Sequence, residues 1–259
     1  MNATTTVPLT WPPKHSVFGV TVSETDYEDA ARAVMDAALR REGGAVTHMA
    51  VHALVTAARD ASYREKVNTF EVVAPDGQPV RWALNRIHGT TLADRVYGPE
   101  LMLRLCGRAA ETGVGVYLYG STDGVVEALR AKLLDRFPAL RVVGCEPSLF
   151  RPLDEEEDDA LVARVNDSGA GLLFLGLGCP LQEAFAYEHR HAIGAVQLCV
   201  GAAFDFHAGN KRMAPGWMQR GGLEWLFRLI QEPRRLWRRY LVTNAMFCLL
   251  FARRLVVGS

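Results

Sequence analysis

Short apolar runs alternate with longer amphipathic segments along most of the chain. The runs predict strands over residues 18–22, 45–49, 70–74, 114–120, 141–144, 171–176 and 196–201. The segments between them carry apolar side chains at helical spacing and predict helices over residues 26–41, 52–67, 98–112, 123–137, 154–168 and 182–190. Strands that are apolar throughout and alternate with helices indicate a parallel sheet covered on both faces. The expected fold class is therefore α/β.

The same pattern divides the chain into three parts. Residues 1–15 have no regular pattern and are expected to form a flexible N-terminal tail. Residues 16–222 contain the alternating elements and are expected to form one domain. Residues 223–259 are rich in arginine, aromatic and aliphatic side chains, and we expect them to form a helical C-terminal appendage.

The residues that follow the strands are candidates for binding and catalysis, because ligands of parallel α/β sheets bind beyond the carboxyl ends of the strands. Gly120 and Ser121 follow one strand and lead into a helix, and Gly201 and Ala202 follow another. Small residues there allow a phosphate to approach backbone N–H groups and the positive end of a helix. An ordinary strand-to-helix turn uses the same residues, so both interpretations stay open.

The segment 176–183 has a more particular composition. Two glycines and a proline shape a tight turn, and Gln182 and Glu183 then fall in the first turn of the next helix. The amide of Gln182 offers a donor and an acceptor together, which suits a uracil edge or sugar hydroxyls. Glu183 either belongs to the same nucleotide site or only complements the helix dipole.

Two aspartates also follow strands. Asp76 comes directly after a buried strand and precedes Gly77. A carboxylate there is suited to act as a general base if the pocket raises its pKa, whereas the alternative is an Asp that only serves a Pro-Asp-Gly turn. Asp205 lies between two phenylalanines and either binds ribose hydroxyls or caps a helix.

The C-terminal segment carries five arginines between residues 228 and 239. Arg228, Arg235 and Arg238 share roughly one helical face if Pro233 does not change the helix direction. Arginine side chains match phosphate geometry, and the neighbouring aromatic and apolar residues are typical of an interfacial segment. We expect these arginines to bind phosphates or the acceptor at a membrane surface. The alternative is a core helix with a solvated basic face.

Composition and absent motifs exclude several classes of protein. The chain has 259 residues, of which 49% are hydrophobic and 22% charged, and its formal net charge is +0, which favours a globular protein and gives no case for nucleic-acid binding. Its five cysteines form no C-x-x-C pair, and His48, His52 and His207 lack metal-ligand spacing, so we expect no metal and no cofactor.

The chain also lacks the signals of secretion and membrane insertion. Its start has no basic region followed by an apolar core, and no apolar run reaches the length needed to span a bilayer. We therefore expect a cytoplasmic protein. Neither a G-x-G-x-x-G fingerprint nor a P-loop is present, which disfavours dinucleotide enzymes and P-loop ATPases.

Six blocks of the chain together resemble the WecG/TagA/CpsF family of glycosyltransferases. In the family's order they are residues 75–77, 94–98, 176–183, 200–206, 214–218 and 223–228. The resemblance extends over about residues 17 to 240. It implies a Rossmann-like domain and an inverting, metal-independent transfer from a UDP-sugar, often of an N-acetylated aminosugar such as N-acetylmannosamine. The implied acceptor is a polyprenyl-diphosphate-linked saccharide in cell-surface or exopolysaccharide biosynthesis.

The resemblance also implies roles for residues of this chain. Asp76 falls on the family's proposed general base, Thr47 on its helper and Gln182 on a further catalytic residue. The three arginines named above fall on those of the family's appendage, which closes over the site and touches the inner face of the cell membrane. Many members have Asn two residues after the Thr, but here that position is Met49, which cannot replace an amide. The identity of the sugar therefore stays open.

Two other functions remain as alternatives. A nucleotide-dependent oxidoreductase or epimerase on the same fold would need the missing dinucleotide fingerprint and would bind NAD. A membrane-associated, non-catalytic component of a polysaccharide assembly complex would neither bind UDP nor hydrolyse the donor. The sequence also leaves open whether the chain forms a homo-oligomer.

Overall fold

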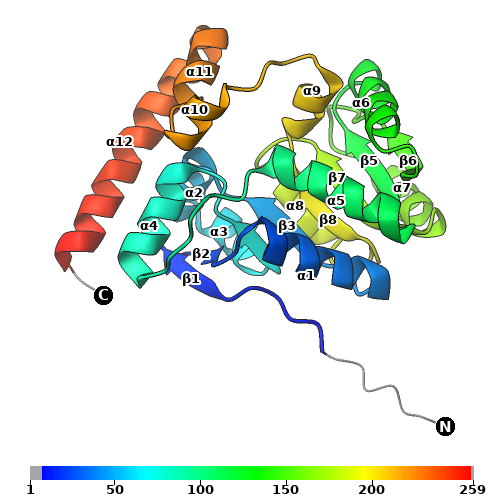
Figure 1. The fold of residues 1–259 in the computed structure, drawn as a ribbon, viewed down its shortest axis with the longest axis horizontal. Coiled ribbons are helices and arrows are strands. Elements are labelled where there is room, and N and C mark those ends of the chain that lie inside the picture. Colours follow the sequence, from blue (N-terminus) through cyan, green and yellow to red (C-terminus); the bar gives the residue numbers. More distant parts are fainter. Residues whose placement is uncertain (1–7, 258–259) are drawn as a thin grey trace.

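A six-stranded parallel sheet forms the centre of the molecule (Figure 1). The computed structural model describes residues 8–257. The strands of the sheet are β3 (Ala45–His48), β4 (Val72–Ala74), β5 (Gly115–Gly120), β6 (Arg141–Glu146), β7 (Ala170–Gly176) and β8 (Val196–Cys199). Their order is β4-β3-β8-β7-β5-β6, and all neighbouring strands are parallel. The predicted α/β fold class and its parallel sheet are confirmed.

Helices cover both faces of this sheet, as the apolar strands required. The helices on one face are α1 (Tyr27–Arg40), α5 (Gly98–Thr112), α6 (Asp123–Arg136) and α9 (Ala203–Ala208). Those on the other face are α2 (Val51–Arg59), α3 (Ala61–Asn68), α4 (Gln78–His88), α7 (Glu155–Asp167) and α8 (Leu181–Glu188). Side chains of β5 alternate between the two cores, because Val116 and Leu118 lie in the first core, whereas Tyr117 and Tyr119 lie in the second.

The segment before α1 forms a hairpin instead of a strand of the main sheet. β1 (Lys14–Val17) pairs antiparallel with β2 (Val20–Ser23). Phe18 and Gly19 connect the two strands with φ of 56° and 84°. The prediction of one strand over 18–22 was therefore wrong at its start, since a two-residue turn with positive φ at both positions reverses the chain there.

The predicted N-terminal tail lies partly outside the described residues. Within the described part, Leu9 and Trp11 pack against the first core. Lys14 and His15 already belong to β1. These described residues of the predicted tail therefore contact the domain.

Two further differences concern helices. The helix predicted over 52–67 is divided into α2 and α3, because Asp60 has extended backbone angles and its carboxylate accepts a hydrogen bond from the N–H of Tyr63 at 3.1 Å. Helix α4 occupies residues for which the pattern predicted no element. Its first turn contains Pro79, which suits a helix N-terminus because that position needs no N–H donor.

The C-terminal part consists of α10 (Gly216–Arg220), α11 (Glu224–Gln231) and α12 (Pro233–Val257). Helix α12 runs along α2 and α4 (Figure 1). Phe247 of α12 is buried in the second core, and its ring lies 5.6 Å from that of Phe18. The predicted helical appendage is therefore packed onto the domain. No helix within residues 8–257 is long and apolar enough to cross a membrane.

Candidate active site

The predicted site residues of the sheet domain lie at one edge of the sheet. The carboxyl ends of the parallel strands all lie there. Thr47 of β3 is opposite Val73 of β4 and Cys199 of β8, and Gly120 at the end of β5 is opposite Gly176 at the end of β7. The loops and helices that follow these strands carry Asp76, Ser121, Gln182, Glu183, Gly201, Ala202 and Asp205.

Asp76 is held by the backbone around it at the end of β4. Its N–H donates to the carbonyl of Met49 at 3.2 Å, and its carboxylate accepts a hydrogen bond from the N–H of Gly98. Burial raises the pKa of this carboxyl to about 7, an effect opposed by Arg95 and Arg228. A carboxyl that ionises near neutral pH is suited to accept a proton, which is what the sequence predicted for this residue.

Arg95 is a residue of the site that the sequence did not single out. Its side chain is 8% exposed, and its Nη1 lies 3.8 Å from Oδ1 of Asp76. Its Nη2 donates to Glu224 at 2.6 Å and to Gln219 at 3.3 Å, and its guanidinium lies over the Tyr97 ring. In the sequence, Arg95 stood out only as part of the block 94–98 that resembles the family. Its partners lie in α10 and α11, which no local pattern connects to it.

A buried cluster joins three predicted residues. Oε1 of Glu183 accepts hydrogen bonds from Oγ1 of Thr47 at 2.8 Å and from Nε2 of Gln182 at 3.0 Å. Oε1 of Gln182 in turn accepts from the N–H of Gly178 at 3.2 Å. Burial raises the pKa of Glu183. Glu183 is therefore turned inward as the acceptor that orients the other two side chains, and it does more than complement the helix dipole.

The glycine turns that were predicted to bind phosphate are tightly packed. Gly120 has a φ of 132°, and a Cβ there would lie 2.6 Å from the carbonyl carbon of Gly176. The N–H of Ser121 donates to the carbonyl of Gly176 at 3.1 Å, and the N–H of Gly201 donates to that of Leu175 at 3.0 Å. These two N–H groups therefore already have acceptors in the protein. The role of the turns in nucleotide binding stays a prediction.

Asp205 lies in the first turn of α9 and is half-buried. Its Oδ2 lies 3.8 Å from Nζ of Lys211. Its backbone carbonyl accepts hydrogen bonds from the N–H groups of Asn210 and Lys211. The carboxylate thus has one distant cationic partner and can still accept hydrogen bonds, which is compatible with the predicted contact to ribose hydroxyls.

The three predicted arginines do not share one helical face. Helix α11 ends at Gln231 and α12 begins at Pro233, so the proline separates Arg228 from the other two. The half-buried Arg228 lies over the Phe206 ring, and its charge lowers the pKa of Asp76, which places it at the site.

Arg235 and Arg238 are exposed. Nε of Arg235 pairs with Glu232 at 2.5 Å, and the guanidinium of Arg238 lies over the Trp237 ring. Only the shared helical face is therefore absent, and the binding of phosphate or acceptor by the three arginines stays a prediction. Arg239, which was not singled out, lies close enough to contribute to the low pKa of His52, about 4, which results first from burial.

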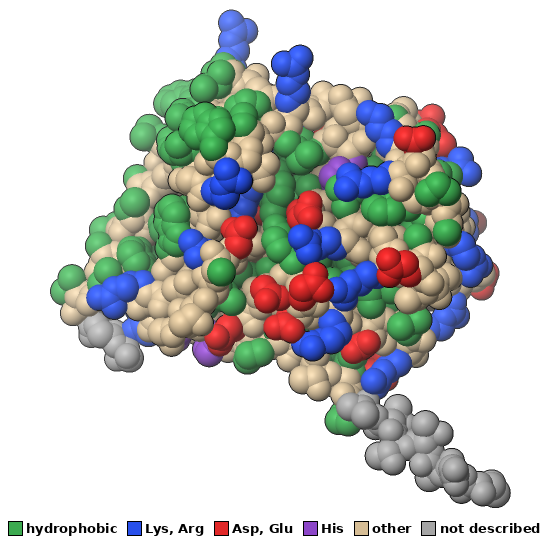
Figure 2. Space-filling view, viewed as in Figure 1, with side chains coloured by type: hydrophobic (Ala, Val, Ile, Leu, Met, Phe, Trp, Pro, Cys, Tyr) green, Lys and Arg blue, Asp and Glu red, His purple; other side chains and the backbone are tan. Residues whose placement is uncertain are grey.

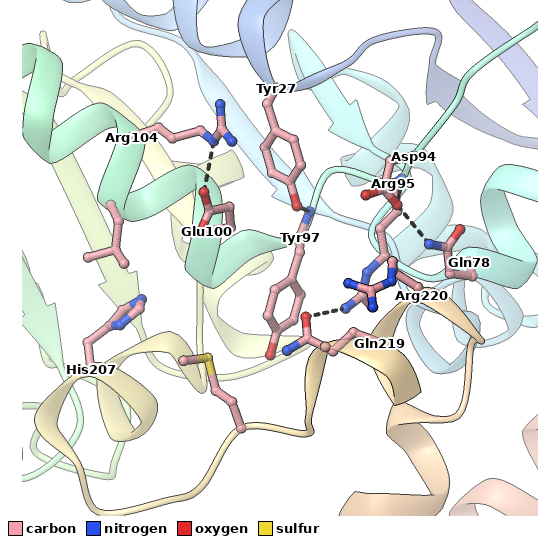
Figure 3. Close-up of a pocket in the computed structure, with 13 residues that line it drawn as sticks. Tyr27, Gln78, Asp94, Arg95, Tyr97, Glu100, Arg104, His207, Gln219 and Arg220 are labelled. Carbon is pink, nitrogen blue, oxygen red and sulfur yellow. Dashed lines mark hydrogen bonds and ion pairs between the residues drawn. The ribbon is translucent and has the colours of Figure 1, made fainter.

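A cavity of about 350 Å³ opens beside Arg95 (Figure 3). Tyr27 and Tyr97 lie near its centre, with Arg104 and Glu100 on one side and Gln219 on the other. None of the residues predicted to bind the nucleotide lines it. Arg95 connects the cavity with the surroundings of Asp76.

His48 and Met49 follow Thr47; His48 is half-buried and Met49 is fully buried. Met49 is 0% exposed and belongs to the second core, so its position contributes no polar group to the site. Nδ1 of His48 bonds to the carbonyl of Cys199 at 3.1 Å, and burial lowers the pKa of His48 to about 4. The imidazole is therefore neutral at neutral pH.

The comparisons with known proteins define the class. A family model described as "Glycosyl transferase WecG/TagA/CpsF family" matches residues 15–258. The chain belongs to this family and is a glycosyltransferase, which favours the main prediction from the sequence over an oxidoreductase or epimerase.

One curated relative is described as an N-acetylglucosaminyldiphosphoundecaprenol N-acetyl-beta-D-mannosaminyltransferase from Bacillus subtilis (strain 168). It is 30% identical to this chain over 187 residues, which cover 71% of this chain and 70% of the relative.

Proposed function

We propose that this glycosyltransferase moves an N-acetylhexosamine or a related hexose from a UDP-sugar to a polyprenyl-diphosphate-linked saccharide in cell-surface or exopolysaccharide biosynthesis. The transfer inverts the anomeric carbon and needs no metal. Family membership and the relative, whose name describes a sugar transfer to a diphosphoundecaprenol-linked acceptor, support the substrate class. The observation that carries the mechanism is the carboxyl of Asp76, which is 17% exposed and has a pKa of about 7, the pH at which a general base is most effective.

The proposed reaction is a single displacement. The acceptor hydroxyl oxygen attacks the anomeric carbon from the face opposite the UDP group and forms the new glycosidic bond. The bond between the anomeric carbon and the β-phosphate oxygen breaks, and UDP leaves with the electron pair. Asp76 accepts the proton of the attacking hydroxyl, a step that typically contributes about 10²–10⁴-fold to the rate.

The cations of the site have different tasks in this reaction. Arg228 is half-buried and close enough to influence Asp76, so it is suited to stabilise the diphosphate that departs. Arg235 and Arg238 are exposed on the appendage and are suited to meet the diphosphate of the lipid-linked acceptor. Thr47 and Gln182 are both hydrogen-bonded to Glu183 and are suited to position the sugar.

The appendage supports attachment to the cytoplasmic face of the membrane. Apolar side chains gather over α10, α11 and the start of α12, with basic side chains, all arginines in these helices, projecting among them (Figure 2). The exposed members include Trp217, Ile230, Trp237 and Leu241. Exposed aromatic and aliphatic side chains next to arginines are typical of a surface that lies in the membrane interface.

The substitution Asp76→Asn tests the proposal. It removes the basic carboxylate and keeps a side chain of the same size, so UDP release in the presence of acceptor should fall by at least about 100-fold. Binding of UDP, followed by thermal shift, should survive. The matched control is Asp167→Asn at the exposed end of α7, which should keep full activity. Comparable turnover in the Asp76 variant and the control would remove Asp76 as the base.

The stereochemistry and the membrane contact are tested separately. The anomeric configuration of the product, read by NMR coupling constants, should be opposite to that of the donor. Replacement of Trp237 and Leu241 by serine should reduce co-sedimentation with anionic lipid vesicles and leave the turnover of a short-chain, water-soluble acceptor unchanged. A product of retained configuration, or vesicle binding equal to that of the unmodified protein, would contradict the respective part.

A further inference from the structure

Arg95 has two carboxylate neighbours at unequal distances. Its Nη2 lies 2.6 Å from Oε2 of Glu224, and its Nη1 lies 3.8 Å from Oδ1 of Asp76. The first distance is a short, charge-assisted hydrogen bond, whereas the second is too long for one. Arg95 is therefore paired mainly with Glu224 and only loosely with Asp76.

The pair is largely shielded from solvent and is contacted from several sides. The side chain of Arg95 is 8% exposed and that of Glu224 is 12% exposed. Gln219 accepts from the same Nη2 at 3.3 Å and donates to the carbonyl of Ala214 at 2.7 Å, and the Tyr97 ring lies 4.3 Å from the guanidinium carbon. Charges this poorly solvated interact strongly, so the choice of partner matters for both carboxylates.

The partner comes from a different part of the molecule. Arg95 and Asp76 belong to the segments that follow β4 and precede α5, whereas Glu224 is the first residue of α11 in the appendage. We propose that Glu224 is a positioning residue, whose carboxylate holds the Arg95 guanidinium away from Asp76 and thereby preserves the ability of Asp76 to accept a proton. This inference rests on the proposed function of Asp76 as the base.

The electrostatic surroundings of Asp76 agree with this arrangement. Arg228 of α11 and the N–H of Gly98 at the start of α5 also act on it, and the charge of Asp76 in turn adds to burial in raising the pKa of Tyr27 and of Tyr97. Burial raises the pKa of Asp76 most, Glu224 raises it further, and Arg95, Arg228 and the N–H lower it. Burial alone would lower the pKa of Arg95, but Asp76 and Glu224 together raise it.

Glu224 couples the position of the appendage to the basicity of Asp76. Without the charge of Glu224, Arg95 is free to close the gap to Asp76 and to stabilise its carboxylate form. Asp76 would then ionise at lower pH and accept a proton less readily. The position of α11 therefore sets the strength of the base, and the base is fully basic only when the appendage supplies Glu224.

The substitution E224Q tests this coupling through the pH profile of kcat/KM between about pH 5 and about pH 9. It removes the charge and keeps a hydrogen-bond acceptor. The acid limb of the profile should move to lower pH by roughly one unit, and the plateau should fall roughly three- to tenfold. The matched control is E71Q, because Glu71 pairs with Arg190 at 3.3 Å just before β4, at the end of that strand opposite to Asp76, and its removal should leave the acid limb in place.

A double-mutant cycle distinguishes this role from a general loss of structure. In an R95A background the coupling partner is absent, so E224Q should produce less than half of the shift that it produces in the unmodified protein. An acid limb unchanged by E224Q in a protein that melts like the unmodified one would overturn the inference. If E224Q does not fold, E224D replaces it in the test. Its shorter side chain lengthens the distance between the carboxylate and Arg95, so the acid limb should move in the same direction. An unmoved acid limb in E224D would overturn the inference.

Failure of the coupling can be told apart from failure of the proposed function. An inactive D76N together with an unmoved limb in E224Q would leave Asp76 as the base and remove only the role of Glu224. An active D76N would remove the base itself, and the role of Glu224 with it.

Discussion

Oγ1 of Thr47 donates a hydrogen bond of 2.8 Å to Oε1 of Glu183, and each of the two residues is only 1% exposed. The same oxygen accepts from Nε2 of Gln182 at 3.0 Å. Two residues that the sequence predicted to be catalytic are thus oriented by one buried carboxyl. Glu183 was predicted either to belong to the nucleotide site or only to complement the helix dipole. Its hydrogen bonds hold the two neighbouring side chains, and its contact with the nucleotide stays a prediction.

The substitution Glu183→Ala should therefore destabilise the fold and reduce turnover. It leaves the hydroxyl of Thr47 and the amide of Gln182 without an acceptor, and each unsatisfied buried group costs about 1–3 kcal/mol. The control on the same helix is Glu188→Ala, because its side chain is 59% exposed and its surface ion pair contributes at most about 1 kcal/mol. Urea unfolding measures the stability of both variants. Equal unfolding midpoints for Glu183→Ala and Glu188→Ala would contradict a central role of Glu183.

The pKa of Asp76 predicts the pH dependence of the reaction. Only the ionised carboxylate accepts a proton, and burial raises its pKa to about 7. The value of kcat/KM should therefore rise with pH through about 7 and level off above it, and Asp76→Asn should lack this limb. A profile that is flat between about pH 5 and about pH 7 would contradict the prediction.

The same shift predicts how Asp76 affects stability. Its pKa is higher in the folded protein than the ordinary value of 3.8, so the folded state binds the proton more tightly than the unfolded state. The stability contributed by the protonated form is fully present below pH 3.8 and is lost as the pH rises through about 7. Above that pH, Asp76→Asn should melt at a temperature equal to or higher than that of the unmodified protein. A lower melting temperature at about pH 8 would mean that the carboxylate stabilises the fold.

Because Arg228 and Arg235 lie at different positions, their replacement should lower kcat/KM by different amounts. Arg228 acts on Asp76 from α11, so Arg228→Ala should lower kcat/KM by roughly 10–100-fold, the value of one or two charge-assisted hydrogen bonds. Arg235→Ala should lower it less than about threefold when the acceptor is short and water-soluble, because Arg235 is 58% exposed and pairs with Glu232. An equal decrease of kcat/KM in the two variants, measured in steady-state assays, would contradict different roles of Arg228 and Arg235.

The turn at Gly120 predicts a loss of stability. Because φ is 132° there and an added Cβ would come within 2.6 Å of the carbonyl carbon of Gly176, Gly120→Ala should destabilise the protein by more than about 2 kcal/mol. Gly124→Ala in α6 is the matched control, because a Cβ there meets nothing within 4 Å and alanine is the better helix former by about 0.5–1 kcal/mol. The melting temperature should therefore fall in the Gly120→Ala variant and rise in the Gly124→Ala variant.

Part of the fold could be predicted because it depends on local patterns. Strands β5 and β7 are continuous apolar runs with all or nearly all residues buried, and such runs next to amphipathic segments indicate a covered parallel sheet. The hairpin β1–β2 was missed because its turn has no Asn-Gly or Asp-Gly signal, although Phe18 and Gly19 both have positive φ. Asp60 was overlooked as a helix boundary because apolar spacing continues across it.

The sequence by itself determined which residues stand at the ends of the strands, and so placed Asp76, Thr47 and Gln182 at one edge of the sheet. It did so because strand polarity and apolar periodicity are properties of neighbouring residues. Only the tertiary structure decided that Arg95 pairs with Glu224, 129 positions away, and that the charge of Arg228 acts on Asp76. Such pairings depend on how α11 and α12 pack against the domain, and packing between distant segments leaves no periodic trace in the chain.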